Sequence, residues 1–329
     1  DLGYRYIQVS PPQKSIATSI WWGRYQPLDF TKIEGPLGNE RQLRRLISAA
    51  HDRGLKILVD IVINHMADPV FYEPALDYPQ FNFWDFHYHA ERPCIEDYGD
   101  RHQTTKFWLC DPAFPDRRLP DLDTSSSYVR SVHKQYLDWL MSMGVDGFRI
   151  DAAKHIEPEY FDWLKRQIPR DKFWYGEVIG GSLGESQLYT PHMMVTDFHM
   201  LGTLLRSFTF GGTVENLIFP EGFGAALPSD RSVVFARNHD TAMHEGFFNF
   251  GDYRDMLLAN AYLLARGQGI PMIYRDDYRN PTVVAGVEFY NRTIGKTTHI
   301  RRASEVCGEF EACSNQILLA IERSDDHFM

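Results

Sequence analysis

Short β-type apolar runs alternate with amphipathic helical stretches along this chain, and that alternation restricts the possible folds more than any other feature. It predicts successive βα units and hence a parallel sheet. Seven strands are expected, near residues 6–9, 56–63, 147–151, 173–178, 193–198, 232–236 and 269–274. A chain of 329 residues is within the size range of one α/β barrel that carries insertions. The predicted fold class is therefore α/β.

Three predicted helices have recognisable boundaries. Asn39 is expected to cap the first helix and Gly54 to end it. The second helix runs from about residue 126 to 143 and ends at Gly144, and the third runs from about 253 to 266. Each lies between two predicted strands, as a βα arrangement requires.

The segment 66–124 interrupts the alternation of predicted strands and helices. It is rich in aromatic residues, Pro, Asp and His and has no helical period. A long segment of this kind inside a compact fold is usually functional. We therefore predict a small inserted domain. The complete division is 1–65 and 125–290 for the barrel, 66–124 for the insert and 291–329 for the start of a C-terminal β domain.

Four cysteines form two close pairs in the sequence, Cys94 with Cys110 and Cys307 with Cys313. Neither pair has the CxxC spacing of a structural zinc site. Two disulfides with short loops in a secreted protein are expected, and four buried thiols in a cytosolic protein are the alternative. No signal peptide is recognisable at the start, where the chain opens directly into a predicted strand.

Composition disfavours several classes of function. The chain has 34 Lys and Arg against 44 Asp and Glu, a formal charge of −10, which disfavours a nucleic-acid partner. No apolar run approaches the roughly 20 residues that span a bilayer, so no membrane segment is predicted. Aromatic residues make up 14% of the chain. Beside carboxylates they suit sugar rings, although individually most of them are expected to fill the core.

Polar residues cluster at the carboxyl ends of four predicted strands. The clusters are 60–65, 149–155, Glu177 and 238–240. The carboxyl ends of parallel barrel strands converge on one face, where active sites lie. A single strand that ends in Asp more often marks a helix cap or an ion pair. Four such clusters on one rim predict an active site.

The residue types in these clusters suit hydrolysis of a glycosidic bond with retention. That reaction needs one carboxylate as nucleophile and one protonated carboxyl group as acid. Asp151 suits the first role and Glu177 the second. Asp240 is a third carboxylate that would raise the proton affinity of the acid and bind the sugar. Arg149 lies on the same side of the strand as Asp151 and would keep that nucleophile ionised.

Several runs resemble the signature segments of the α-amylase family, glycoside hydrolase family 13, and they occur in the right order. The four main ones are DIVINH (60–65), GFRIDAAKH (147–155), GEVI (176–179) and FARNHD (235–240). LPDLD (119–123) resembles a fifth segment, and similarity to animal and actinobacterial α-amylases is carried by WWGRYQP (21–27) and LPSDR (227–231). The resemblance extends from residue 1 to about residue 280.

The resemblance implies a (β/α)8 TIM barrel that hydrolyses α-1,4-glucosidic bonds inside starch or glycogen chains with retention. It assigns the nucleophile to Asp151, the general acid and base to Glu177 and transition-state stabilisation to Asp240. Other positions match residues that bind the sugar chain in the family, namely Trp21, Trp22, Tyr25, Gln26, His65, Arg149, Lys154 and His239.

The resemblance also implies a calcium ion between the barrel and the insert. Asn64 and Asp121 would bind it through their side chains, and His155 through its backbone carbonyl. Calcium takes about six to eight oxygen ligands, so further groups must contribute, and Asp111 and Asp116 are close in sequence.

Chloride, which some related amylases bind, is doubtful here. Arg149 and Asn238 match two of its ligands, but Met272 stands where the third, a basic residue, is needed. Arg275 is the nearest basic residue that a shifted alignment could place there.

Two parts of the family pattern are expected to be missing. The chain opens at what resembles the second barrel strand, and the C-terminal β domain stops short at Met329. Neither gap removes a catalytic carboxylate.

Three other functions compete with endo-hydrolysis. An exo-acting α-glucosidase or transglycosylase would share the fold, but the Trp21 and Trp22 platform favours an open cleft. A carbohydrate-binding or transport-associated protein would usually lack one of the three acids. A nucleotide-binding α/β protein would need a Gly-rich phosphate loop, and none follows a predicted strand. The leading prediction is a secreted, monomeric enzyme that acts on α-glucans.

Overall fold

The computed structural model describes residues 2–70, 72–111, 113–209, 212–243, 248–302 and 319–324. The chain divides into two compact units. The N-terminal unit comprises Arg5–Gly181 and Leu188–Met194, and the C-terminal unit comprises Asp1–Tyr4, Ser182–Gln187 and Val195–Met329. In the described ranges, every helix is too short or too polar to cross a membrane.

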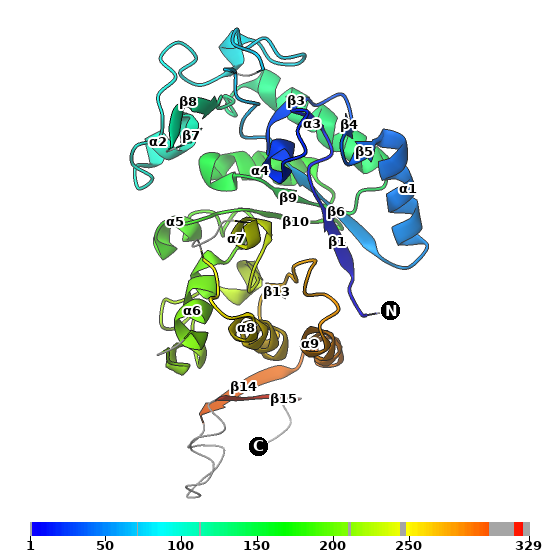
Figure 1. Ribbon diagram of the computed structural model, residues 1–329, viewed down its shortest axis with the longest axis vertical. Helices are drawn as coiled ribbons and strands as arrows, with labels where there is room; N and C mark the ends of the chain where they lie inside the picture. The colour runs from blue at the N-terminus through cyan, green and yellow to red at the C-terminus, as the bar shows by residue number, and fades with distance from the viewer. Residues whose placement is uncertain are drawn as a thin grey trace, which may run out of the picture. The chain divides into compact units, whose positions relative to one another are not determined.

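Four parallel strands form the sheet of the N-terminal unit, as the alternating pattern predicts. In order across the sheet they are β1 (Tyr6–Val9), β6 (Lys56–Ile61), β9 (Gly147–Ile150) and β10 (Phe173–Gly176) (Figure 1). All of β9 is buried, and so is β6 after Lys56. Both faces of β6 and β9 are therefore covered, as is typical of the inner strands of a parallel sheet. Gly147 permits the close strand pairing, since a Cβ there would lie 2.0 Å from the carbonyl oxygen of Phe173.

Helices connect these strands and begin where the local sequence predicts. Helix α1 (Glu40–His51) starts with a capping box, in which the Asn39 side chain accepts a hydrogen bond from the backbone of Gln42. Its buried face consists of Leu43, Ile47 and Ala50. The other helices of this part are α3 (Ser127–Ser142), which Ser126 caps, and α4 (Pro158–Gln167). The predicted cap at Asn39 is therefore confirmed.

The predicted insert, residues 66–124, lies between β6 and α3. It contains one six-residue helix, α2 (Arg101–Lys106), and an antiparallel hairpin of β7 (Leu109–Asp111) and β8 (Phe114–Leu119). Cys94 and Cys110 form a disulfide with Cα atoms 5.6 Å apart, which confirms the first predicted pair. Cys307 and Cys313 lie outside the described residues.

Short elements complete the N-terminal unit. Two small antiparallel pairs join β2 (Lys14–Ser15) to β3 (Pro27–Asp29) and β4 (Glu34–Gly35) to β5 (Gly38–Asn39). Single helical turns of the 3₁₀ type are η1 (Trp21–Tyr25), η2 (Phe83–Asp85) and η3 (Ala153–His155).

The C-terminal unit continues the βα pattern. Its parallel strands are β11 (Met194–Thr196, of which Met194 belongs to the N-terminal unit), β12 (Ser232–Val234) and β13 (Ile270–Pro271). Its helices are α5 (Leu183–Gln187), α6 (Phe198–Phe208), η4 (Glu215–Leu217), η5 (Ser229–Arg231), α7 (His239–Met243), α8 (Tyr253–Arg266) and α9 (Pro281–Arg292). An antiparallel pair, β14 (Thr297–Arg302) and β15 (Leu319–Ser324), follows. All seven predicted strands are thus confirmed, with ends that differ by a few residues.

Candidate active site

The centre of the candidate site is the guanidinium of Arg149 on β9, whose residue is only 2% exposed. Its Nη1 donates to both carboxylate oxygens of Asp60, at 2.9 and 2.8 Å, and to Oδ1 of Asp151 at 2.7 Å. Its Nη2 pairs with Oε1 of Glu177. One buried cation therefore contacts three carboxyl groups that come from β6, the end of β9 and the end of β10.

The parallel register explains this convergence. Asp60 pairs with Arg149, and Tyr175 on β10 pairs with Arg149 from the other side. The backbone hydrogen bonds between neighbouring strands continue past the strand ends. The amide of Asp151 donates to the carbonyl of Ile61 at 2.9 Å, and the amide of Glu177 donates to the carbonyl of Ile150 at 2.8 Å. Residues two apart on a strand share a face. Arg149 and Asp151 therefore point to the same side, as the sequence predicts.

Burial dominates the electrostatics of the cluster. It raises the pKa of Asp60 well above its usual value and also raises the pKa of Asp151, while the positive charge of Arg149 partly offsets both effects. The negative charge of Glu177 raises the pKa of Asp151 further. Carboxyl groups this close titrate as a coupled set. Such a set can keep one carboxyl group protonated beside an ionised one, which acid catalysis with a nucleophile requires.

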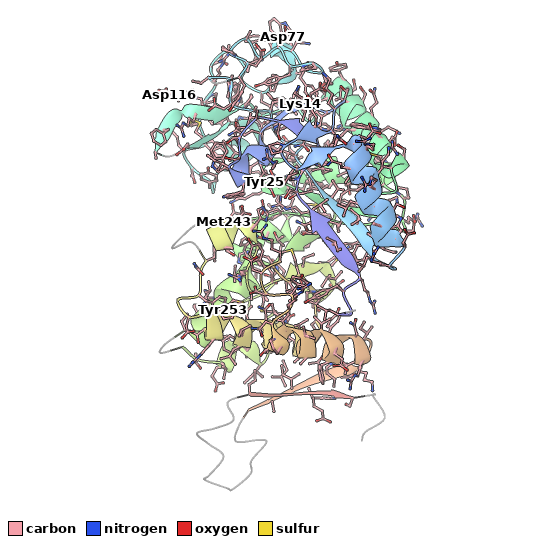
Figure 2. All side chains as sticks on the ribbon, turned by 45° about the vertical axis from the view of Figure 1, so that its right-hand side comes forward. Lys14, Tyr25, Asp77, Asp116, Met243 and Tyr253 are labelled. Atoms are coloured by element: carbon pink, nitrogen blue, oxygen red, sulfur yellow. A yellow bond between two sulfur atoms is a disulfide. The ribbon has the colours of Figure 1, made fainter. Side chains whose placement is uncertain are left out.

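Tyr25, labelled in Figure 2, connects the aromatic segment at residues 21–25 to this cluster. Its hydroxyl donates to Oδ2 of Asp60 at 3.0 Å, and the guanidinium of Arg149 lies 5.7 Å from the centre of its ring. Trp21 packs edge-on against Tyr25, with ring centres 6.0 Å apart. Trp22 is 37% exposed, so part of its ring is available for contact with a ligand.

His65 is a second predicted residue beside the cluster. Its Nε2 is 2.9 Å from the carbonyl oxygen of Tyr25. Burial lowers the pKa of His65, although the charge of Asp151 opposes the shift. A neutral ring must donate from Nε2 to reach that carbonyl, which leaves Nδ1 as an acceptor for the Asn64 amide at 3.3 Å. Gln26 is held nearby, since its Oε1 accepts from the backbone of Asp68 at 3.2 Å.

Lys154 lies in η3, immediately after β9, and is 5% exposed. Its backbone donates to the carbonyl of Glu177 at 3.2 Å, so the loops after β9 and β10 are joined. Its Nζ lies 5.6 Å from the centre of the Tyr98 ring. Tyr98 comes from the segment between β6 and α3 and is not among the site residues that the sequence predicts. Only spatial contact reveals it, because no motif surrounds it in the sequence.

Two of the predicted calcium ligands, Asn64 and Asp121, lie next to each other. The backbone of Leu122 donates to the carbonyl of Asn64 at 2.9 Å, which brings Asn64 next to Asp121. Oδ1 of Asn64 is buried and has no hydrogen-bond partner. Burial raises the pKa of Asp121 to about 7. A buried amide oxygen without a donor beside a buried carboxyl group fits a hard cation.

His87 competes with a cation for Asp121. Its Nδ1 is 2.7 Å from Oδ2 of Asp121, and its Nε2 is 3.1 Å from Oδ1 of Asp123. Burial lowers the pKa of His87, but these two hydrogen bonds outweigh it and raise the pKa to about 9. Among the described residues, no three His, Cys, Asp or Glu side chains converge as a metal site. A cation here would depend on amide and carbonyl oxygens in addition to the Asp121 carboxylate.

The third predicted calcium ligand, His155, lies in η3, after β9. Its Nδ1 is 2.9 Å from the carbonyl oxygen of Thr104 in α2, and the group predicted to bind the cation is its backbone carbonyl. Asp116 is unsuitable as a ligand, since its side chain is 96% exposed.

His239 and Asp240 lie in the C-terminal unit, in the first turn of α7, with four residues, 235–238, between the end of β12 and this helix. Asn238 caps this helix, because its Oδ1 accepts from the backbone of Thr241 at 2.9 Å. His239 Nε2 is 3.5 Å from Oδ2 of Asp240. Arg275, the alternative chloride ligand, is 76% exposed and pairs with its neighbour Asp276, so its guanidinium faces solvent.

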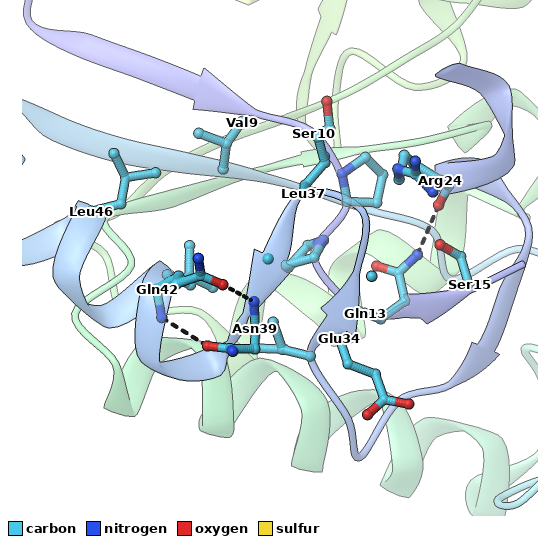
Figure 3. A pocket seen from close by; sticks show the side chains of 16 residues that line it. Val9, Ser10, Gln13, Ser15, Arg24, Glu34, Leu37, Asn39, Gln42 and Leu46 are labelled. Carbon is cyan, nitrogen blue, oxygen red and sulfur yellow. Dashed lines mark hydrogen bonds between the residues drawn. The ribbon is translucent and has the colours of Figure 1, made fainter. Parts of the chain in front are cut away.

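A cavity of about 220 Å³ lies elsewhere in the N-terminal unit, between β1, the β4–β5 hairpin and α1 (Figure 3). Part of its polar lining is engaged: Gln13 donates to the carbonyl of Arg24 at 3.1 Å, and Asn39 and Gln42 form the capping box of α1. Nη1 of Arg24 is buried without a hydrogen-bond partner. Its lining contains none of the predicted site residues. The chemistry of the chain is therefore concentrated at the strand ends and not in this cavity.

A parallel βα fold with clustered carboxyl groups at its strand ends defines a TIM-barrel protein of the kind that carries glycosidase sites. Residues 1–182 match the family described as alpha amylase, catalytic domain. The chain belongs to this α-amylase family, and the predicted α/β barrel fold is confirmed.

Individual relatives agree with this assignment. An α-amylase of Aeromonas hydrophila is 34% identical over 310 residues, which cover 83% of this chain and 66% of the relative. An α-amylase of Streptomyces violaceus is 33% identical over 83% of this chain and 48% of the relative. The chain thus spans between about half and two thirds of these relatives. The crystal structure of α-amylase I from Eisenia fetida has a TM-score of 0.78 at 25% identity and covers 90% of this chain and 74% of that one.

Proposed function

We propose that this chain hydrolyses α-1,4-glucosidic bonds inside starch-type polysaccharides with retention of configuration. The observation that carries the proposal is the shared guanidinium: Arg149 contacts both Asp151 and Glu177. Two carboxyl groups on one cation are close neighbours, and retaining hydrolysis needs a separation of only about 5 to 5.5 Å. Membership of the α-amylase family supports the choice of an α-glucan as substrate.

The two carboxyl groups divide the reaction between them. Asp151 attacks the anomeric carbon and forms a covalent glycosyl intermediate, while Glu177 gives its proton to the departing glycosidic oxygen. Glu177 then removes a proton from water, which attacks the same carbon and releases Asp151. Arg149 stabilises the ionised form of Asp151 between these steps. Asp240 is assigned to hold the sugar hydroxyls in the transition state, as a third carboxylate.

The remaining predicted residues are assigned to binding the sugar chain. We assign Trp21, Trp22 and Tyr25 to a platform for sugar rings, since each offers a flat apolar face. The polar groups assigned to the sugar hydroxyls are Gln26, His65, Lys154 and His239.

Starch and maltose distinguish the proposed activity from its competitors. With soluble starch we expect iodine colour to disappear early, while few reducing ends have formed and little glucose is present, because internal bonds are cut first. With maltose we expect slow or no release of glucose. Reducing-end and glucose assays on the same time course check both results. Rapid release of glucose from maltose would instead indicate an exo-acting enzyme, and folded protein without activity on either substrate would contradict the proposal.

We propose calcium as the cofactor, held by Asn64 Oδ1, Asp121 and the carbonyl of His155. When bound, calcium would join the insert to the loop after β9 and stabilise the fold. A ligand at 100 times its dissociation constant stabilises the native state by about 2.7 kcal/mol. We therefore expect a chelator to lower the melting temperature and added calcium to restore it, as measured by scanning calorimetry.

A pair of variants tests the location of this calcium site. Asn64→Leu should abolish the calcium-dependent rise in melting temperature, because it removes the buried amide oxygen. Asp116→Asn is the matched control and should keep the response, since that side chain is almost fully exposed. An unchanged response in Asn64→Leu would show that calcium binds elsewhere.

We propose the same domain division as the sequence indicates, with 66–124 as an inserted domain and 291–329 as the start of a C-terminal β domain. We also propose a secreted, monomeric protein. The Cys94–Cys110 disulfide supports secretion, because disulfides persist in oxidising compartments. The net charge of −10 supports a partner other than nucleic acid.

A further inference from the structure

An ion pair in the C-terminal unit joins the segments that follow its parallel strands β12 and β13. Arg237 follows β12, and Asp277 follows β13. Nε of Arg237 donates to Oδ2 of Asp277 at 2.8 Å, and Nη2 donates to Oδ1 at 2.6 Å. The contact is therefore bidentate, which fixes direction as well as distance. Asp277 is fully buried, and three quarters of the Arg237 side chain is covered.

Residues at the N-termini of two helices, α8 and α9, also join this ion pair through hydrogen bonds. The hydroxyl of Tyr253, the first residue of α8 (labelled in Figure 2), donates to Oδ1 of Asp277 at 3.2 Å. Asn280, which caps α9, donates to that hydroxyl at 3.4 Å. The guanidinium also lies over the rings of Tyr274 and Tyr253, at 5.1 and 5.8 Å from their centres. These contacts hold Arg237 from several sides.

Arg237 directly precedes the turn that presents Asp240. Asn238 and Thr241 exchange two hydrogen bonds, from the Thr241 backbone to Asn238 Oδ1 at 2.9 Å and from the Asn238 backbone to Thr241 Oγ1 at 3.0 Å. The backbone of Ala242 donates to the Asn238 carbonyl at 3.0 Å. All three bonds involve Asn238, the neighbour of Arg237, so loss of the anchor at Arg237 would loosen these bonds as well as move the turn.

We propose that the Arg237–Asp277 pair positions Asp240 for catalysis; this inference rests on the proposed function. Arg237 and Asp277 touch neither substrate nor reacting atoms in this assignment. They act through the turn 238–241, which carries His239 and Asp240. A displacement of about 1 Å in a catalytic group can cost about 100-fold in rate, so an anchor this close to Asp240 affects turnover.

Arg237→Lys tests the proposal, because it keeps the charge and removes the fork that makes the contact bidentate. We expect kcat on starch to fall by about 10 to 100-fold with a smaller change in KM. Arg292→Lys is the matched control, since Arg292 forms an exposed pair with Glu288 on α9 and is 70% exposed; it should behave as the wild type. Unchanged kcat in Arg237→Lys, with an active wild-type enzyme, would overturn the proposal.

A double-mutant cycle separates positioning from a general structural role. If Arg237 acts through Asp240, adding Arg237→Lys to Asp240→Asn should lower the residual rate by less than about threefold, because the group being positioned is already lost. A further loss of 10-fold or more would show that Arg237 acts on something other than Asp240.

Hydrogen exchange gives a readout that does not depend on activity. In Arg237→Lys the amides of Thr241 and Ala242 should exchange at least 10-fold faster than in the wild type, while amides in β9 keep their rates. Unchanged protection of these two amides would overturn the proposal even if the wild-type chain were inactive. Inactive wild-type protein with faster exchange in the variant would contradict only the proposed function.

Discussion

Glu177→Gln is expected to lower kcat on starch by about 100 to 10,000-fold, the usual contribution of general acid catalysis. Glutamine preserves the size of the side chain and its contact with Arg149 but has no proton to give to the departing oxygen. Binding of the sugar chain depends on other residues, so KM should stay within about threefold. Initial rates on soluble starch and calorimetric binding of a maltooligosaccharide check the two expectations. Retained activity would show that another group is the acid.

Two comparisons make the Glu177 prediction specific. Glu159→Gln is the matched control, since that side chain lies on α4 and is 73% exposed; its kcat should equal that of the wild type. With a nitrophenyl maltoside, whose leaving group departs without a proton, bond cleavage should fall much less than with starch. An equal loss on both substrates would indicate a damaged fold instead of a missing acid.

Arg149→Met should destabilise the fold by about 3 to 5 kcal/mol at pH 7, the usual cost of leaving buried charges without their partner. The residue is 2% exposed and contacts Asp60, Asp151 and Glu177. Urea unfolding measures the loss. Arg44→Met is the matched control, because Arg44 forms an exposed pair with Glu40 and should cost less than about 1 kcal/mol. If Arg149→Met also cost less than about 1 kcal/mol, Arg149 would not be the common partner of the three carboxyl groups.

The Arg149 variant should also depend on pH in a defined direction. Burial already raises the pKa of Asp60 and Asp151, and Arg149 opposes this. Without Arg149 the folded-state pKa values rise further, so the native state holds protons that the unfolded state releases above about pH 4. The destabilisation should therefore grow as pH rises from about 4 to 7. For any residual activity, the acid limb of the kcat/KM profile should move to higher pH. A stability loss that is equal at both pH values would contradict the predicted coupling.

The role of Asp60 cannot be predicted from the sequence alone. The sequence places it in a polar cluster at a strand end and indicates no role for it. The structure makes it the group that Arg149 binds through both oxygens and Tyr25 through its hydroxyl. The signal was present in part, since Asp60 and Arg149 occupy matching positions near the ends of two predicted strands. Their register is set by pairing between strands 89 residues apart, and no local pattern reports it.

By itself the sequence determined the seven strands, the cap of α1 at Asn39 and the acids that end the strands, because strand periodicity and helix capping depend on neighbours a few residues away. Only the tertiary structure decided that one guanidinium serves Asp60, Asp151 and Glu177, and that Tyr98 lies over Lys154. Those contacts join segments far apart in the chain, and their electrostatic strength comes from burial, which exists only once the sheet and helices have packed.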